Sequence, residues 1–394
     1  MSFNFNYYSP TKVIFGRGTH KQVGELVKAE GAKKVLIHYG GQSAKKSGVL
    51  DAVKASLDEA GIPWVELGGV VPNPHLELVY EGIELCRREG VDFILAVGGG
   101  SVIDSSKAIA YGLAYDGDVW DLFMGKAKAP GCYPVGAVLT IAAAGSETSN
   151  STVITYAKEA LKRSYNDNVA RPRFAVMNPE LTMTLPDYQT ESGCTDIMMH
   201  TMERYFTNGG NLELTDELAE ALLRTVIKYA KVLHTDPTNY EARANIMWAG
   251  SLAHNDLTGC GNDGGDFASH LLEHEMGGMF DVTHGAGLAA VWPSWARYVC
   301  RDCLPRFVRY AVNVMGVEPG KDDLETAERG IAAMEDFYHA IGMPVNMREL
   351  GIDPTDEQIH TMAVLCAQAS GGCKGSAKVL YQDDMEAIYH MAKG

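Results

Sequence analysis

The sequence predicts an α/β domain with a parallel sheet, followed by an all-α domain. Short apolar runs alternate with amphipathic stretches in the first half of the chain, and helical spacing runs through almost all of the second half. The length of 394 residues is sufficient for two domains of ordinary size.

The first half is expected to contain five buried strands, because each run is short, apolar and rich in β-branched residues. The runs are VLIHY (35–39), WVEL (64–67), FILAV (93–97), VGAVLTI (135–141) and FAVM (174–177). Amphipathic stretches such as 49–60 and 75–89 lie between them. Strands that alternate with helices in this way form a parallel sheet covered by helices.

The second half is expected to be nearly all helix. Residues 212–234, 240–254 and 325–342 and the end of the chain show helical spacing, with few strand-like runs. The change in character follows Leu185-Pro186. We therefore predict one domain over residues 1–186 and a second over residues 187–394.

Composition restricts the partners of the protein. A hydrophobic content of 46% and a charged content of 21% are those of an ordinary globular chain. The formal net charge of −16 repels nucleic-acid backbones and anionic lipid surfaces, so we expect neither as a partner. The lack of a leader-like segment and of any apolar stretch of about 18 residues predicts a cytoplasmic protein. The eight cysteines lack the density of a disulfide scaffold and are expected to be reduced.

Two glycine-rich turns follow predicted strands. GGGS (98–101) comes after FILAV and precedes a helical stretch, and GGQS (40–43) comes after VLIHY. Glycines at such a turn let a backbone approach a phosphate, and the next helix N-terminus supplies N–H donors. Two such turns on one sheet fit a dinucleotide bound across its carboxyl edge. The alternative is that each is merely a tight turn.

The residues after the second turn bear on the choice of cofactor. No Asp or Glu follows this strand to accept a hydrogen bond from a ribose hydroxyl, whereas Ser43, Lys45 and Lys46 are placed to meet a 2′-phosphate. This pattern favours NADP(H) over NAD(H). The alternative is that the two lysines form a solvated helix face.

Histidines concentrate in one segment: four of the twelve, His254, His270, His274 and His284, fall within residues 254–284. Such clustering is typical of a metal site. The stretch HLLEH (270–274) also matches H-x-x-E-H, a zinc-peptidase pattern in which both histidines bind zinc.

A carboxylate lies upstream of this cluster. Asp196 and His200 are four residues apart in a helical stretch, so their side chains share a face, and Glu203 follows one turn further. A single pair of this kind is usually an ordinary hydrogen bond. With His270 and His284, however, the pair forms a donor set of one carboxylate and three imidazoles, which suits one divalent ion such as Fe²⁺ or Zn²⁺.

These residues and motifs together resemble one family. The features that carry the resemblance are Asp196, His200, His270 and His284, at spacings of 4, 70 and 14, and the motifs GGGSVID (98–104) and AGSET (144–148). They resemble the iron-containing (group III) alcohol dehydrogenases over nearly the whole chain. The resemblance is closest to the butanol dehydrogenase and NADPH-dependent aldehyde reductase branch.

The resemblance implies a dehydroquinate synthase-like architecture, with an N-terminal dinucleotide-binding domain and an all-helical C-terminal metal-binding domain. It assigns the four residues Asp196, His200, His270 and His284 to the metal. The residues that it assigns to the cofactor are Gly40, Gly41, Ser43, Gly98, Gly99, Ser101, Thr140, Ser149 and Lys162. Lys46 and Asp104 are further expected cofactor contacts. It places His274 beside the nicotinamide as a catalytic residue and leaves Glu273 a structural role, so HLLEH is not a peptidase motif.

The resemblance also implies a homodimeric enzyme that interconverts primary, butanol-like alcohols and aldehydes by hydride transfer with NADP(H) or NAD(H). A metal-dependent hydrolase that uses the same Asp/His site without a nucleotide is the alternative function. A non-catalytic nucleotide-binding protein is a further alternative, and it would not need the four metal-type residues.

Overall fold

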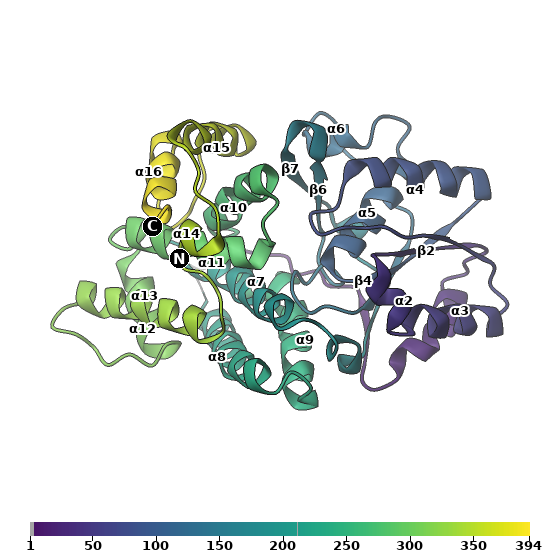
Figure 1. Cartoon of the computed structure of the whole chain (residues 1–394), viewed down its shortest axis with the longest axis horizontal. Helices are drawn as coiled ribbons and strands as arrows, with labels where there is room; N and C mark the ends of the chain where they lie inside the picture. Colours follow the sequence, from purple (N-terminus) through teal and green to yellow (C-terminus); the bar gives the residue numbers. More distant parts are fainter. Residues whose placement is uncertain (1–3, 211) are drawn as a thin grey trace. The chain divides into compact units, whose positions relative to one another are not determined.

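The computed structural model describes residues 4–210 and 212–394, apart from the side chains of residues 42 and 43 (Figure 1). The chain forms two compact units. The first consists of Ser9–Leu185 and Pro237–Ser251, and the second of Pro186–Asp236 and Leu252–Gly394 together with the N-terminal residues up to Tyr8.

This division differs from the predicted one in the helix after residue 236. Residues Pro237–Ser251, expected in the second domain, belong to the first unit. Their side chains explain the difference, because Met247 is buried in an apolar cluster of that unit and the Trp248 ring packs edge-on against Phe15 at 6.4 Å. Helical spacing alone does not reveal which core a helix joins.

The first unit contains a parallel sheet of six strands in the order β1-β8-β5-β4-β2-β3. The strands are β1 (Lys12–Phe15), β2 (Val35–Tyr39), β3 (Trp64–Leu67), β4 (Phe93–Gly98), β5 (Val135–Leu139) and β8 (Phe174–Met177). An antiparallel hairpin of β6 (Ser151–Tyr156) and β7 (Leu161–Asn166) is separate from this sheet and was not predicted. β2 and β4 are buried along their whole length, as expected for strands covered on both faces.

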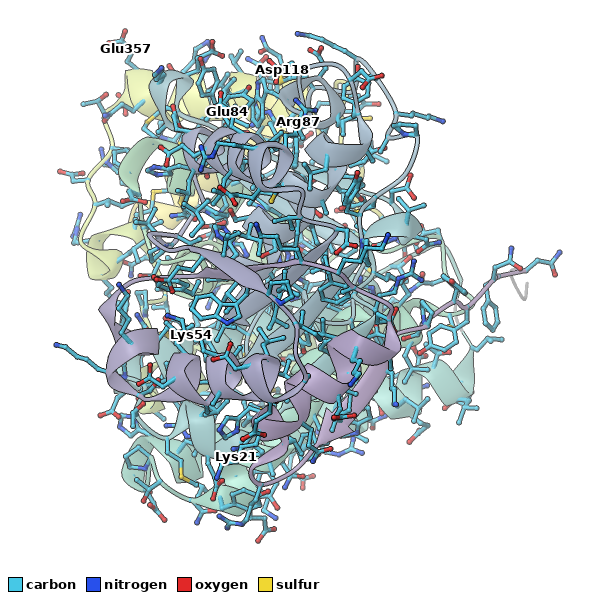
Figure 2. All side chains as sticks on the ribbon, turned by 90° about the vertical axis from the view of Figure 1, so that its right-hand side faces the viewer. Lys21, Lys54, Glu84, Arg87, Asp118 and Glu357 are labelled. Atoms are coloured by element: carbon cyan, nitrogen blue, oxygen red, sulfur yellow. The ribbon has the colours of Figure 1, made fainter. Side chains whose placement is uncertain are left out.

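Helices cover the sheet. They are α1 (Val23–Ala29), α2 (Gln42–Lys46), α3 (Val49–Glu59), α4 (Leu76–Glu89), α5 (Gly100–Ala114) and α6 (Trp120–Phe123). Lys54 of α3 pairs with Glu66 of β3 at 2.6 Å, and Arg87 of α4 donates to the carbonyl of Gly112 in α5 at 2.8 Å (Figure 2). The first contact joins a helix to the sheet, and the second joins two neighbouring helices.

One buried histidine connects three elements of this unit. His38 of β2 is fully buried; its Nδ1 lies 2.8 Å from the Leu67 carbonyl oxygen and its Nε2 lies 2.8 Å from Ser105 Oγ. Burial lowers the pKa of His38 to about 4, because a charged imidazole loses its hydration there. His38 is therefore a neutral structural residue near neutral pH.

The second unit is helical. Its helices are α7 (Asp187–Tyr205), α8 (Glu213–Thr235), α10 (Ala268–Phe280), α11 (His284–Val299), α12 (Leu304–Asn313), α13 (Asp323–Ala340), α14 (Met347–Leu350), α15 (Asp356–Ala369) and α16 (Gln382–Ala392); α9 (Tyr240–His254) contributes its last residues. Aromatic rings fill its core, with Phe206 stacked on Phe307 at 4.3 Å. The predicted fold class, a parallel-sheet domain and a helical domain, is confirmed.

Within the described residues, the helices are all too short or too polar to span a bilayer.

Candidate metal centre and nucleotide-binding turns

Three helices of the second unit carry the predicted metal ligands: α7, α10 and α11 (Figure 1). Asp196 and His200 lie on α7, His270 lies in the first turn of α10, and His284 is the first residue of α11. The close packing of α11 on α7 depends on Gly285, since a Cβ there would lie 2.0 Å from the carbonyl oxygen of Ser192. The helices thus bring donors far apart in sequence to one place.

The donor atoms converge on one oxygen. Nε2 of His270 and Nε2 of His284 each lie 3.7 Å from Oδ1 of Asp196. The three donors lie within 4.8 Å of one another. Two donors on one tetrahedral metal with bonds of about 2.0–2.1 Å are about 3.3 Å apart. The observed spacing therefore fits a single small cation with only slight movement of the side chains.

Hydrogen bonding supports the same fit. In the described part of the chain, Oδ1 of Asp196, Nδ1 of His200 and Nε2 of His270 are buried and have no hydrogen-bond partner. Buried polar atoms are normally satisfied, so each needs an explanation. A cation at this point would satisfy them, and a set of imidazoles and a carboxylate without thiolate suits Fe²⁺ or Zn²⁺.

His200 lies beside this group but outside its tightest part. Its Nδ1 is 3.2 Å from Asp196 Oδ1, and its ring centre is 4.6 Å from that of His270, but it is not one of the three donors that lie within 4.8 Å of one another. The ring of His254 lies 3.9 Å from that of His200. Burial, followed by the nearby His254 and His270, lowers the pKa of His200 well below its usual value, so this imidazole is neutral and able to donate a lone pair.

Two carboxylates behind the cluster hold its histidines. Oε1 of Glu203 accepts from the backbone N–H of His270 at 2.9 Å and lies 3.1 Å from its Nδ1. Oε2 of Glu273 accepts from Nδ1 of His284. Burial acts to lower the pKa of His270, but Asp196 and Glu203 outweigh it and raise the pKa to about 9. The surroundings of His270 therefore favour a positive charge.

From the sequence, Glu203 had no predicted role and Glu273 only a structural one. Helical spacing placed Glu203 near the ligands, but only the fold shows which ring each carboxylate holds. His274, the predicted catalytic residue, is half-buried, and its ring centre lies 5.9 Å from that of His284. The donor atoms of His274, Glu273 and His284 lie within 4.8 Å of one another, and Asp196 is not part of this group. His274 therefore lies next to the predicted ligands.

In the first unit, the glycine turns follow adjacent strands. Tyr39 at the end of β2 pairs with Val97 of β4, so the turns at Gly40 and Gly98 open at the same edge of the sheet. From β2 the chain proceeds to β3 on one side, and from β4 to β5 on the other. A parallel sheet binds ligands where its strand order reverses in this way.

The GGGS turn is packed tightly. A Cβ at Gly98 would lie 2.4 Å from Val102, and one at Gly100 would lie 2.8 Å from the Cβ of Ala144. α5 begins at Gly100, and its first backbone hydrogen bonds run from the Val102 and Ile103 N–H groups to the Gly99 carbonyl at 3.1 Å, so the N–H groups of Gly100 and Ser101 precede them. Packing thus accounts for these glycines, and the helix end still offers donors to an anion.

Gly41 is different. Its φ is not positive, and a Cβ built on it would meet nothing within 4 Å. Neither backbone strain nor packing within the described residues requires glycine there, and the open space leaves room for the backbone to approach another molecule. Lys46 is exposed at the end of α2, and the ammonium of Lys45 lies 5.5 Å from the Tyr39 ring centre. The predicted contact of Ser43 lies outside the described side chains.

A buried polar network supports the segment after β5. Asp104 accepts from Ser146 Oγ at 2.5 Å and from the Val153 N–H at 3.0 Å. The Lys107 ammonium, fully buried, donates to Ser146 Oγ at 2.9 Å and to the Ser149 carbonyl at 3.0 Å. Lys107 was not predicted from the sequence, although a lysine three residues after Asp104 in an apolar helix is a usable signal. Asp104 and Ser149, both predicted cofactor contacts, are thus also held by protein atoms.

The other predicted cofactor residues lie in the same unit. The Thr140 N–H donates to the Gly98 carbonyl at 3.0 Å, which fixes the loop after β5 to the GGGS turn. Gly99 caps the start of α5. Lys162 is buried on β7, opposite Thr155 of β6.

Comparisons with known proteins show the family of the chain. Residues 10–179 match the profile of iron-containing alcohol dehydrogenases, and residues 190–393 match that of the C-terminal part of the Fe-containing alcohol dehydrogenase family. NADH-dependent butanol dehydrogenase A of Clostridium acetobutylicum is 41% identical over 98% of both chains. NADPH-dependent aldehyde reductase YqhD of Escherichia coli is 36% identical over 89% of this chain and 90% of its own. The crystal structure of NADH-dependent butanol dehydrogenase A from Thermotoga maritima superposes with a TM-score of 0.95 at 39% identity, covering 99% of each chain.

The chain belongs to the iron-containing alcohol dehydrogenase family. It is an oxidoreductase of the alcohol–aldehyde type. The hydrolase alternative finds no support among these relatives.

Proposed function

We propose that this protein reduces short aliphatic aldehydes to primary, butanol-like alcohols and oxidises the alcohols in the reverse direction. The proposed cofactors are NADP(H), in preference to NAD(H), and one divalent ion, Fe²⁺ or Zn²⁺. The observation that carries the proposal is the convergence of His270 Nε2 and His284 Nε2 on Asp196 Oδ1.

Asp196, His270 and His284 would hold the metal, with His200 as the fourth ligand beside Asp196. When bound, a divalent metal supplies Lewis-acid polarisation of a carbonyl or hydroxyl oxygen, and a nicotinamide supplies or accepts the hydride. The protein contributes the orientation of its donors, of which Asp196, His200 and His270 are buried.

His274 is proposed to act on the proton. It lies one helical turn beyond His270 on α10, and its half-buried ring stands next to His284. An imidazole is suited to exchange a proton with an alcohol oxygen near neutral pH. In aldehyde reduction it would assist delivery of the proton, and in alcohol oxidation it would assist its removal.

The cofactor preference is supported by the end of β2. No acidic side chain follows Tyr39 to accept from a ribose 2′-hydroxyl, Gly41 has open space around it, and Lys46 is exposed. A 2′-phosphate would find a cation there rather than a carboxylate. Since the butanol dehydrogenase relatives are named as NADH-dependent, NADPH and NADH must be compared directly.

We also propose that the protein is a homodimer in the cytoplasm. Phe5, Tyr7 and Tyr8 near the N-terminus are 49%, 44% and 56% exposed, an apolar surface that a second copy of the chain could cover. Light scattering on the purified protein gives the mass in solution, and a mass of one chain would contradict the dimer.

The function is tested by anaerobic purification, metal analysis and initial rates with NADPH and NADH against a panel of aldehydes. We expect bound Fe²⁺ or Zn²⁺, oxidation of NADPH with butanal, and slower oxidation of NADH at equal low concentration. A metal-loaded protein that oxidises neither cofactor with any aldehyde would contradict the proposed reaction.

A further inference from the structure

Glu273 belongs to neither group of predicted site residues, yet it is fully buried and contacts a proposed ligand. It lies on α10, three residues after His270. Its Oε2 is hydrogen-bonded to Nδ1 of His284, the first residue of α11. Burying a carboxylate without a hydrogen-bond partner would destabilise the fold, so this contact stabilises Glu273 in its buried position.

The contact determines which nitrogen of His284 is available. A carboxylate accepts hydrogen bonds, so the proton of the imidazole lies on Nδ1. The lone pair is then on Nε2, which faces Asp196 Oδ1 at 3.7 Å. Carboxylates that hold metal-ligating histidines in this way fix the ring and raise its basicity.

The neighbouring helix leaves room for this carboxylate. A Cβ on Gly287 of α11 would lie 2.9 Å from Cγ of Glu273 and 3.2 Å from its Oε1. Glycine at position 287 therefore lets the Glu273 side chain reach His284. α10 thus carries the predicted ligand His270 and, through Glu273, also holds the predicted ligand His284 of α11.

We propose that Glu273 is a positioning residue of the metal centre, which sets the affinity for the metal through His284. This inference rests on the proposed function, since it presumes that His284 binds the metal. It also gives the E of HLLEH a role other than that of a peptidase base: Glu273 is 0% exposed and engaged by an imidazole.

The test measures the Zn²⁺ dissociation constant of the metal-free full-length protein by competition with a chromophoric chelator. Glu273→Leu removes the acceptor and should weaken Zn²⁺ binding by about 10–100-fold. Glu273→Gln keeps an amide oxygen that can accept from Nδ1 of His284. Its Zn²⁺ dissociation constant should therefore lie between those of Glu273→Leu and the unsubstituted protein. Gly287→Ala displaces the side chain without altering its charge and should also weaken binding.

The matched control is Glu220→Gln. Glu220 is also buried, with 1% of its surface exposed, and its Oε1 accepts a hydrogen bond from the Tyr205 hydroxyl at 2.8 Å. This variant should lower the melting temperature and leave the Zn²⁺ constant unchanged, which separates loss of fold stability from loss of positioning.

The inference is overturned if Glu273→Leu binds Zn²⁺ as tightly as the unsubstituted protein, or if Glu220→Gln weakens binding equally. If Glu273→Leu does not fold, the glutamine and Gly287→Ala variants decide the matter by the same comparison. Failure of the proposed function has a different signature, because the unsubstituted protein would then bind no more Zn²⁺ than His270→Ala.

Discussion

Gly285 of α11 packs against Ser192 of α7, where a Cβ on Gly285 would lie 2.0 Å from the Ser192 carbonyl oxygen. His284 directly precedes Gly285, and Asp196 lies about one turn after Ser192. The packing of α11 on α7 therefore sets the separation between an imidazole and the carboxylate.

Gly285→Ala should push α11 away from α7 and so separate His284 from Asp196. We expect a lower melting temperature, by the equivalent of about 1–3 kcal/mol or more, and loss of most bound metal. Gly131→Ala is the control, since a Cβ there meets nothing within 4 Å. Metal content and thermal melts of both variants provide the check, and normal metal occupancy in Gly285→Ala would show that this packing does not position the donors.

His274→Ala should retain its metal and lose aldehyde reduction. The His274 ring lies next to His284, but His274 is not part of the cluster of donor atoms that contains Asp196. A general acid–base group typically contributes about 10²-fold to the rate. Metal analysis beside initial rates measures the two effects separately. A metal-free His274→Ala protein would mean that this residue is a ligand, as the peptidase pattern requires.

Lys46→Ala should raise the KM for NADPH much more than the KM for NADH, because only NADPH carries the 2′-phosphate that an exposed ammonium would meet. Lys21→Ala, at another lysine of the same unit (Figure 2), is the control for the loss of one positive charge. Equal changes in both KM values would remove the support for a phosphate contact at this position.

Stability should depend on pH through His38. Its folded-state pKa of about 4 lies below the ordinary 6.5, so the unfolded chain binds a proton first as the pH falls. Stability is thus complete above pH 6.5 and decreases between pH 6.5 and pH 4, by about 3 kcal/mol from this residue. Melting temperatures between pH 7 and 4.5 should fall more steeply for the natural sequence than for His38→Gln. Parallel curves would indicate that the pKa of His38 in the folded protein equals that in the unfolded chain.

The parts of the fold predicted from sequence are those with a strong local signal. β2 and β4 are continuous apolar runs, and the structure places them within a residue of the predicted ranges. The β6–β7 hairpin was missed because its strands, STVITY and LKRSYN, mix polar and apolar residues without a continuous run. The assignment of most of α9 to the first unit depends on tertiary contacts such as that of Trp248 with Phe15. The periodicity of the sequence does not predict such contacts.

The site shows the same limit. Residue type and spacing led to Asp196, His270 and His284, and the fold brings those three together. The roles of the carboxylates depend on distances between separate helices: Glu203 is 67 residues from His270 in sequence, and Glu273 contacts a histidine of another helix. Spacing along the chain therefore indicates the donors but not the groups that orient them.

Metal content of anaerobically purified His270→Ala and His284→Ala proteins tests the central claim most directly. His360→Ala, at an exposed histidine paired with Glu386 at 2.9 Å, serves as the control for loss of an imidazole. We predict that the control binds as much iron or zinc as the unsubstituted protein, while His270→Ala and His284→Ala lose most of their metal together with aldehyde reduction. Full metal occupancy with unchanged turnover in either variant would contradict the assignment of these histidines as ligands.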